Sequence, residues 1–503
     1  MSAEEPEIIH SPEENAPLNE NSSRYAEGRV DYDDDLLNEL ARASKSRRND
    51  KIGDSVWKST LNIIYDSIPS AVYTAAIYIV RAIDLSFVTR AEGTVAAAGI
   101  GIGATWVTLV VLMFIVSLNH GTTTLVSQAF GAHNFDTAGL CLHRALIVRL
   151  PIMIIQFMLL MFSKIILINF NIQEEVAQEA AIYCWYATFS LIPFVLLDTF
   201  KSFLFGHQIF FPIVIVMTMG ITIHWGMCYY FVIVLGLGVK GAGLAYFVNV
   251  TSCVILLFLY FAIWKPTKNT LFWLKKESTH KLLPQLGNEI VIGGMNYLES
   301  LVWESMALLI GSYSSAQINA HSMSYSIASL SYMPLVGVGT TITVYTSYFI
   351  GEKDIPLIQK SVRYAIVIPL VTSTITIITF ALLKDEIFSL YTTDAEVIEI
   401  ATQISWLYIA FGPLEHMKGL LAAILKAIGR EKQEMVAYLV SYYLVGFPVE
   451  YVLGTLGKWY DLGVWIGLIV GSVTLYTLIV VILIFTDYNK QIKVIEKRVK
   501  YLD

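Results

Sequence analysis

The chain has 503 residues, of which 55% are hydrophobic and 15% are charged, and its formal net charge at pH 7 is −7. A mean hydropathy of +0.59 accompanies a charged fraction well below the roughly 25% of an average soluble domain. This composition excludes an ordinary soluble protein and predicts an all-α integral membrane protein.

The N-terminal segment, residues 1–54, carries much of the negative charge, in acidic residues that lie among Ser, Asn and Pro. A segment of this composition buries too little apolar surface to fold. No apolar stretch near Met1 resembles a signal peptide. We therefore predict a disordered acidic tail, for which plain solvation is the simplest interpretation and a regulatory or sorting role is the alternative.

Apolar segments then recur along the chain, each long enough to cross ~30 Å of hydrocarbon as a helix. Several contain Pro or Gly, which bundled helices tolerate because neighbouring groups satisfy the freed backbone. About twelve spans are predicted, at residues 61–88, 95–120, 143–168, 178–204, 209–234, 239–263, 288–311, 318–346, 362–383, 398–424, 434–456 and 462–485.

Basic residues cluster before the first span, between the sixth and seventh, and after the last. By the positive-inside rule both termini are cytoplasmic, which requires an even number of spans. The predicted organisation is a tail, an N-terminal lobe, a cytoplasmic linker, a C-terminal lobe and a basic cytoplasmic tail, at residues 1–54, 55–264, 265–286, 287–487 and 488–503. Both the plasma membrane and a vacuolar or endosomal membrane fit these features.

Short motifs recur at a separation of about 220 residues. Gly121-Thr122-Thr123 matches Gly339-Thr340-Thr341, and Leu237-Gly238-Val239 matches Leu462-Gly463-Val464. The matches indicate a duplicated six-helix unit. Because six is even, the two copies have the same orientation, so we expect parallel repeats related by an axis along the membrane normal, with a substrate cavity between them.

Carboxyl groups inside the predicted spans are candidate functional groups, because an ionisable side chain in lipid costs several kcal/mol. Glu299 has no basic residue within two turns along its own helix. Glu415 lies three residues before Lys418, so a helical salt bridge is the competing interpretation of that glutamate. The deep candidates are Asp84, Asp198, Glu299, Glu304, Glu415 and Glu450.

Burial favours the neutral form of a carboxyl, which lets it bind and release protons near neutral pH. If a proton and a cationic substrate exclude each other at one glutamate, a proton gradient drives the cation in the opposite direction. We predict that Glu299 is the main coupling carboxyl, that Glu304 and Glu415 assist it, and that Asp84 couples in the N-terminal half.

Aromatic and polar side chains near these carboxyls are predicted to line the substrate cavity, where ring faces hold an organic cation. Ordinary packing of aromatic rings and a hydrogen-bonded buried histidine are the alternatives. The predicted cavity residues are Tyr297, Trp303, Gln317, His321 and Tyr325.

The segment Leu298-Glu299-Ser300-Leu301-Val302-Trp303-Glu304 resembles the seventh-helix pattern of eukaryotic members of the multidrug and toxic compound extrusion (MATE) family, in which two glutamates bracket aromatic residues. Leu125–Ala132 and Ile424–Arg430 resemble motifs of the family's second and tenth helices. Asp84 resembles the first-helix aspartate that prokaryotic members use in cation coupling, and Glu415 falls where eukaryotic members have an acidic residue.

This resemblance runs from about Ser55 to Asp487. It implies two six-helix bundles that export organic cations, drugs or metabolites in exchange for protons, with sodium as the less favoured counter-ion. The expected partners are a small-molecule substrate, the counter-ion and the bilayer; we expect a monomer that binds no nucleic acid.

Two other functions remain as alternatives. A flippase for lipid-linked oligosaccharides of the same superfamily would need a cationic cavity for phosphates, and few basic residues are predicted to lie deep. A membrane-embedded enzyme would need a catalytic constellation, and none is visible. The four cysteines show no paired spacing, so neither a metal site nor a cofactor is predicted.

Overall fold

The computed structural model describes residues 56–170, 172–265, 267–268, 270–310, 313, 315–391 and 395–502. The predicted tail at residues 1–54 lies outside these ranges, and so does the side chain of Glu304. The helices considered below belong to the compact unit Thr60–Asp503.

The N-terminal half consists of long helices, several of which are continued by a π or 3₁₀ turn. In chain order they are α2 (Val56–Glu92), α3 (Thr94–Val107), η3 (Thr108–Leu112), α4 (Met113–Gly131), α5 (Phe135–Met161), α6 (Ser163–Asn169), α7 (Glu174–Ala187), η4 (Thr188–Ser190), α8 (Leu191–Gly206), α9 (Pro212–Cys228), η5 (Tyr229–Val234) and α10 (Gly238–Trp264).

The C-terminal half follows after a short 3₁₀ turn in the linker. The turn in the linker is η6 (Lys276–Thr279). The elements of the C-terminal half are α11 (Leu282–Ile310), α12 (Ser315–Gly351), α13 (Ile355–Tyr391), α14 (Ala395–Ala427), α15 (Glu431–Tyr438), η7 (Leu439–Gly446), α16 (Phe447–Tyr451), η8 (Val452–Leu456) and α17 (Tyr460–Ile484), followed by α18 (Tyr488–Leu502).

The described ranges contain 10 helical stretches long and apolar enough to cross a membrane. α11 and α12 are two further long helices, of 29 and 37 residues, and they occupy the seventh and eighth predicted spans. α11 carries three carboxyls along its length, Glu289, Glu299 and Glu304. The prediction of an all-α protein with about twelve spans is thus confirmed.

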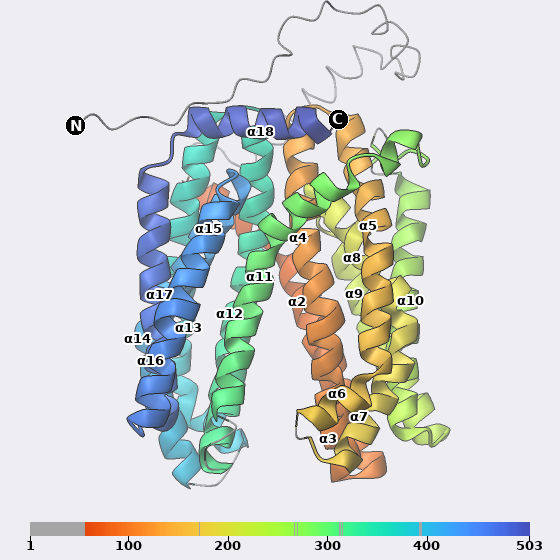
Figure 1. Ribbon diagram of the computed structural model, residues 1–503, viewed down its shortest axis with the longest axis vertical. Coiled ribbons are helices and arrows are strands. Elements are labelled where there is room, and N and C mark those ends of the chain that lie inside the picture. Colours follow the sequence, from red (N-terminus) through yellow and green to blue (C-terminus); the bar gives the residue numbers. More distant parts are fainter. Residues whose placement is uncertain are drawn as a thin grey trace, which may run out of the picture. The chain divides into compact units, whose positions relative to one another are not determined.

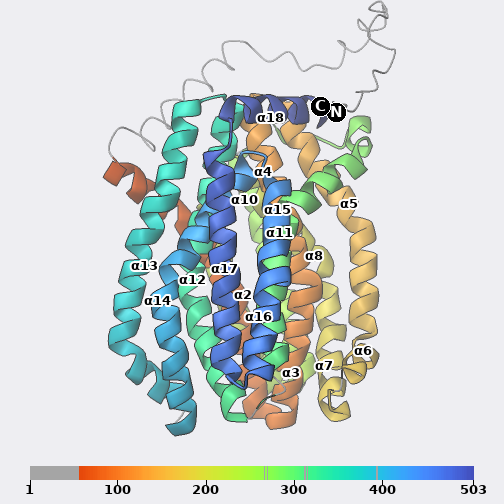
Figure 2. The ribbon, with the colours of Figure 1, turned by 60° about the vertical axis from the view of Figure 1, so that its left-hand side comes forward.

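The basic C-terminal tail, for which no secondary structure is predicted above, forms the amphipathic helix α18. Ile492, Ile495, Val499 and Leu502 are buried along one face of α18, while most of its basic residues are exposed. This pattern is that of a helix lying on a protein or membrane surface. In Figures 1 and 2, α18 lies across the ends of the long helices, and it contacts both α4 and α12.

The two halves pack closely where α4 meets α11 and α12. A Cβ atom added to Gly293 of α11 would overlap the backbone carbonyl of Ser117 in α4, whereas one added to Gly294 would meet nothing. Similarly, a Cβ at Gly351 of α12 would overlap the carbonyl of Gln128 in α4. Because α18 bridges the same helices, the halves are joined at the end of the bundle that carries the C-terminus (Figure 1).

Candidate functional site

A carboxylate–lysine cluster lies within the C-terminal half, built from α11 and α14. Lys418 Nζ is 2.5 Å from Glu415 Oε1 and 3.5 Å from Glu299 Oε1. The ammonium also donates to the hydroxyl of Tyr442 over 2.7 Å, and this hydroxyl is 2.6 Å from Ser472 Oγ. One buried ammonium is therefore shared by two carboxylates from different helices.

This arrangement revises the view of both glutamates from the sequence. The salt bridge considered as the competing interpretation of Glu415 is present. Glu299, which has no basic neighbour on its own helix, is paired across helices with Lys418, because the long lysine side chain reaches from α14 to the α11 carboxylate. If both carboxylates are ionised, the cluster of two carboxylates and one ammonium has a net charge of one negative unit. In addition, Glu299 Oε1 accepts no hydrogen bond from the described residues.

Four aromatic rings gather close to the cluster. The ring centroids of Trp303 and Tyr325 are 5.6 Å apart, and His321 stacks on Tyr325 at 6.1 Å. Trp465 of α17 lies 6.2 Å from Trp303 and 6.0 Å from His321. Because Glu299 and Trp303 are four residues apart on α11, they lie on the same face of that helix.

We call Trp303, His321, Tyr325 and Trp465 the ring cluster. Within it, His321 is buried, with 4% of the residue exposed, and neither of its ring nitrogens has a hydrogen-bond partner among the described residues. A buried polar atom without a partner is costly. The two nitrogens are therefore available to a ligand or to water.

Of the other two predicted cavity residues, Tyr297 lies at the boundary between the halves, and Gln317 lies one turn before His321 on α12. Tyr297 packs edge-on against Phe114 of α4 at 5.5 Å, which places it at the boundary between the halves. Gln317 Oε1 accepts from the backbone N–H of Asp461 at the start of α17, over 3.3 Å. Trp303, His321 and Tyr325 make ring contacts with one another or with Trp465, and Gln317 lies one turn away along α12.

Asp84 forms a second centre, in the N-terminal half, where it is fully buried. Its Oδ1 is 3.1 Å from His224 Nε2 and 3.3 Å from Cys228 Sγ, and its Oδ2 accepts from the hydroxyl of Tyr183 over 3.0 Å. Arg81, which precedes Asp84 by three residues on α2, donates instead to the Gly101 carbonyl and to Thr105. His224 is buried and paired with Asp84 through Nε2.

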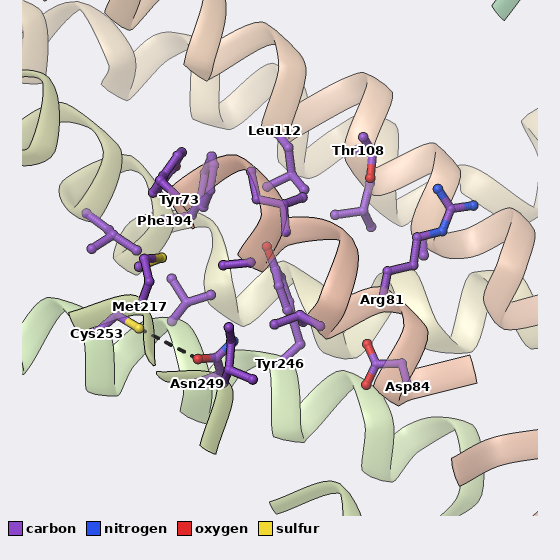
Figure 3. A pocket seen from close by; sticks show the side chains of 18 of the residues that line it. Tyr73, Arg81, Asp84, Thr108, Leu112, Phe194, Met217, Tyr246, Asn249 and Cys253 are labelled. Atoms are coloured by element: carbon purple, nitrogen blue, oxygen red, sulfur yellow. Dashed lines mark hydrogen bonds between the residues drawn. The ribbon is translucent and has the colours of Figure 1, made fainter. Parts of the chain in front are cut away.

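Asp84 also lines a pocket within the N-terminal half, between α2, α3, α7, α8, α9 and α10. In Figure 3, Asp84 and Arg81 lie at one end of the pocket, and Tyr73, Phe194 and Met217 lie at the other. The lining is largely apolar, with a few polar groups, as in many small-molecule sites. This pocket lies inside one half, whereas the sequence placed the cavity between the halves.

A second acid–lysine pair lies on α8, where Lys201 Nζ binds Asp198 Oδ1. Asp198 also accepts from the hydroxyl of Tyr73 over 2.5 Å and from the amide of Asn119 over 2.6 Å. α8 forms the second part of the fourth predicted span and α14 contains the tenth, so the pairs Asp198–Lys201 and Glu415–Lys418 occupy equivalent places in the repeat. Sequence reasoning considered the pair Glu415–Lys418 but missed Lys201, although an acid-x-x-Lys pattern at matching positions was visible.

A buried ion pair joins the two halves and was also missed. Arg149 of α5 binds Glu289 of α11 over 2.8 Å, with both side chains 0% exposed. The guanidinium also donates to Asn119 over 2.7 Å and to Thr122 over 3.1 Å, and Glu289 accepts from Thr122 over 2.8 Å. We call these four residues the inter-half network. It lies in the same region as Gly293 and Ser117, where the halves pack closely.

Arg149, Lys201 and Lys418 are basic residues that are buried in the protein. Each of them is paired with a carboxylate. A buried cation that is already paired offers little to a phosphate, because the desolvation penalty has been offset by its partner. These three cations do not build the uncompensated cationic cavity that a flippase would need.

Replacing Lys418 with Met is expected to destabilise the protein by about 3–5 kcal/mol, because it leaves two carboxylates together in a buried site without their cation. Thermal unfolding of the detergent-purified protein measures this loss. The double variant Glu415→Gln, Lys418→Met removes one charge of each sign and should recover much of the stability. Equal losses for the single and double variants would show that the ammonium contributes through packing alone.

Comparisons with known proteins agree with this architecture. The family model MatE matches residues 69–230 and 292–452, that is, once in each half. "Protein DETOXIFICATION 18" of Arabidopsis thaliana is 24% identical over 459 residues, covering 91% of this chain and 97% of that protein. "Multidrug and toxin extrusion protein 1" of Danio rerio is 25% identical over 447 residues, covering 88% of this chain and 72% of that protein.

Solved structures show the same fold. The crystal structure of the eukaryotic MATE transporter AtDTX14 superposes with a TM-score of 0.81 at 21% identity, covering 88% of this chain and 99% of that one. A MATE protein in the bent conformation gives a TM-score of 0.75 at 16% identity, covering 88% and 97%. With the family model matched in both halves, the chain belongs to the MATE family of multidrug and toxin extrusion transporters.

Proposed function

We propose that this transporter exports organic cations in exchange for protons, by alternating access between its two halves. The observation that carries the proposal is the charge balance of the Glu299–Lys418–Glu415 cluster. Two carboxylates share one ammonium, so the cluster is neutral only when it holds one further positive charge. A proton and an organic cation are the two candidates for that charge, and binding of one opposes binding of the other.

Glu299 is the site proposed for this exchange. Its Oε1 accepts no hydrogen bond among the described residues, and the side chain is 23% exposed, whereas Glu415 is 5% exposed and closer to Lys418. Glu415 and Lys418 would then hold Glu299 in place. Glu304, and Asp84 in the other half, stay in the proposal as assisting carboxyls.

The ring cluster supports a cationic substrate. Aromatic faces attract cations most strongly where water is excluded, and Trp303 is one turn from Glu299 on the same face of α11. The names of the relatives refer to multidrug and toxin extrusion, which fits a site that selects charge and apolar surface over a particular shape. The exported compounds would accordingly be organic cations of varied structure.

Alternating access requires that the contacts joining the halves form and break. The inter-half network and the approach of Gly293 to Ser117 lie near the end spanned by α18. The sequence predicts a cytoplasmic C-terminus, so the proposal assigns this conformation to a state closed on the cytoplasmic side. For export, these contacts would have to break so that the substrate could enter the cavity from the cytoplasm.

The driving ion is tested with purified protein in liposomes, by measuring uptake of tetraethylammonium, a permanent organic cation. Imposing an acidic interior at equal sodium on both sides should drive accumulation, because outward protons exchange for inward cations. An outward sodium gradient at uniform pH should drive none. If the sodium gradient drove tetraethylammonium accumulation and the pH gradient did not, sodium and not the proton would be the coupling ion.

A further inference from the structure

We propose that Asp84, His224 and Cys228 form a binding site for a divalent transition-metal ion, with Zn²⁺ as the first candidate. All three side chains are fully buried, and each presents one ligand atom. Asp84 Oδ1 lies 3.1 Å from His224 Nε2 and 3.3 Å from Cys228 Sγ, and the last two atoms are 3.4 Å apart. The three ligand atoms form a nearly equilateral triangle.

The size of this triangle fits a metal ion. Zinc binds carboxylate oxygen and imidazole nitrogen at about 2.0–2.2 Å and thiolate sulfur at about 2.3 Å, so tetrahedral ligands lie about 3.3–3.7 Å apart. The observed separations are a few tenths of an ångström shorter, which a small rotation of the side chains corrects. Sulfur, nitrogen and oxygen together suit zinc and its transition-metal neighbours better than calcium or magnesium.

The helices hold the ligands in place before any ion binds. His224 and Cys228 are four residues apart on α9 and therefore share one face of that helix, and the π turn η5 begins directly after Cys228. Such turns are frequent at functional sites. Asp84 comes from α2 and is oriented by the Tyr183 hydroxyl on its other oxygen, as outer partners commonly orient metal-binding carboxylates.

Three protein ligands leave a fourth tetrahedral position for water or another molecule, the arrangement of exchangeable rather than purely structural zinc sites. Asp84 lines the pocket of Figure 3, which gives the ion a route to the site. Coordination converts the Cys228 thiol to a thiolate and releases its proton to solvent. A bound divalent ion would also occupy the Asp84 carboxylate and so compete there with protons or organic cations.

The competing interpretation is a hydrogen-bonded triad that never binds metal. Metal binding is measured on the full-length, detergent-purified protein after chelation, by titrating Co²⁺ and following the absorption band of a cobalt–thiolate bond. We expect that band to appear, and Zn²⁺ to abolish it by displacement. Cys228→Ser should remove the band, and His224→Gln should weaken affinity at least about tenfold.

Cys253→Ser is the matched control, because Cys253 lines the same pocket but its sulfur contacts Asn249 and the Val216 carbonyl. That variant should bind cobalt as the wild type does. Absence of the band in the wild type, or its persistence in Cys228→Ser, would overturn the proposal. Neither result depends on transport, so this experiment tests the metal site independently of the proposed antiport.

A second measurement covers the case in which the Cys228 variant does not fold. Alkylation of the four cysteines of the wild type is followed over hours in mild denaturant, where local opening exposes buried thiols, and is quantified by mass spectrometry; it should slow at Cys228 when Zn²⁺ is present. Rates at Cys184 and Cys253 should not change. Equal rates at Cys228 with and without zinc would refute the site without any substitution.

Discussion

The variant Arg149→Met is expected to lose about 3–5 kcal/mol of stability, because it leaves the Glu289 carboxylate buried between the halves without its cation. Both side chains of this pair are 0% exposed. The guanidinium also donates to Asn119 and Thr122, which come from α4. It donates to the Ala145 carbonyl as well, so its removal leaves four oxygen atoms with fewer donors, and each buried unsatisfied group adds to the cost.

The loss should appear as a lower thermal unfolding temperature and as parting of the halves. Ser127 reports the second effect, since its hydroxyl donates to the Val344 carbonyl of α12 over 2.7 Å and the residue is fully buried. Cysteine placed at Ser127 should react slowly with maleimide in the wild type and faster in Arg149→Met. The four native cysteines are buried, which keeps background labelling low.

The double variant Arg149→Met, Glu289→Met is the control, because replacing both members of a buried pair by apolar groups is often nearly neutral. It should recover most of the stability lost in the single variant. The double-mutant cycle isolates the energy of the pair from the packing of either side chain. Additive losses in the cycle, with unchanged labelling at position 127, would show that the pair does not hold the halves together.

Glu299→Gln is expected to insert and fold normally and to lose gradient-driven transport. Gln keeps the shape and hydrogen-bonding capacity of the side chain but removes its titration. With Gln at this position, Glu415 and Lys418 form a neutral pair by themselves, so the cluster no longer attracts a further charge. Glu299→Asp keeps the titration and shortens the reach, and it should retain part of the transport.

Tetraethylammonium uptake into liposomes under a pH gradient measures this effect. Glu450→Gln is the matched control, because Glu450 is a carboxyl on α16 that is 1% exposed, and no role in coupling is proposed for it. It should transport as the wild type does. Full proton-driven uptake by a well-folded Glu299→Gln protein would remove Glu299 from the mechanism.

The sequence predicted the spans and their number well, because about 20 apolar residues are needed wherever a helix crosses lipid. It also predicted the Glu415–Lys418 contact as one of two alternatives, since an i, i+3 pair depends only on helix geometry. The helix α18 was not foreseen, although its apolar positions recur with helical spacing. The charged composition indicates only a tail. The helical spacing of Ile492, Ile495 and Val499 is the feature of the sequence that predicts an amphipathic helix.

The candidate site was less accessible to sequence reasoning, because its contacts join helices far apart in the chain. Lys418 reaches Glu299 from α14, and Arg149 reaches Glu289 from the other half. Neither distance follows from spacing along one helix. The deep charges predicted from the sequence are all carboxyls. Burying Arg149 or Lys201 carries the same free-energy cost, so these two cations were candidates on the same physical ground.

The most direct test of proton–cation exchange is to record internal pH in liposomes that hold the wild-type protein, start at equal pH on both sides and have a potassium-clamped membrane potential. Adding tetraethylammonium outside should make the interior more alkaline, because each entering cation exchanges for a leaving proton, and Glu299→Gln liposomes should show no change. Cation entry without any change of internal pH in the wild type would contradict the account.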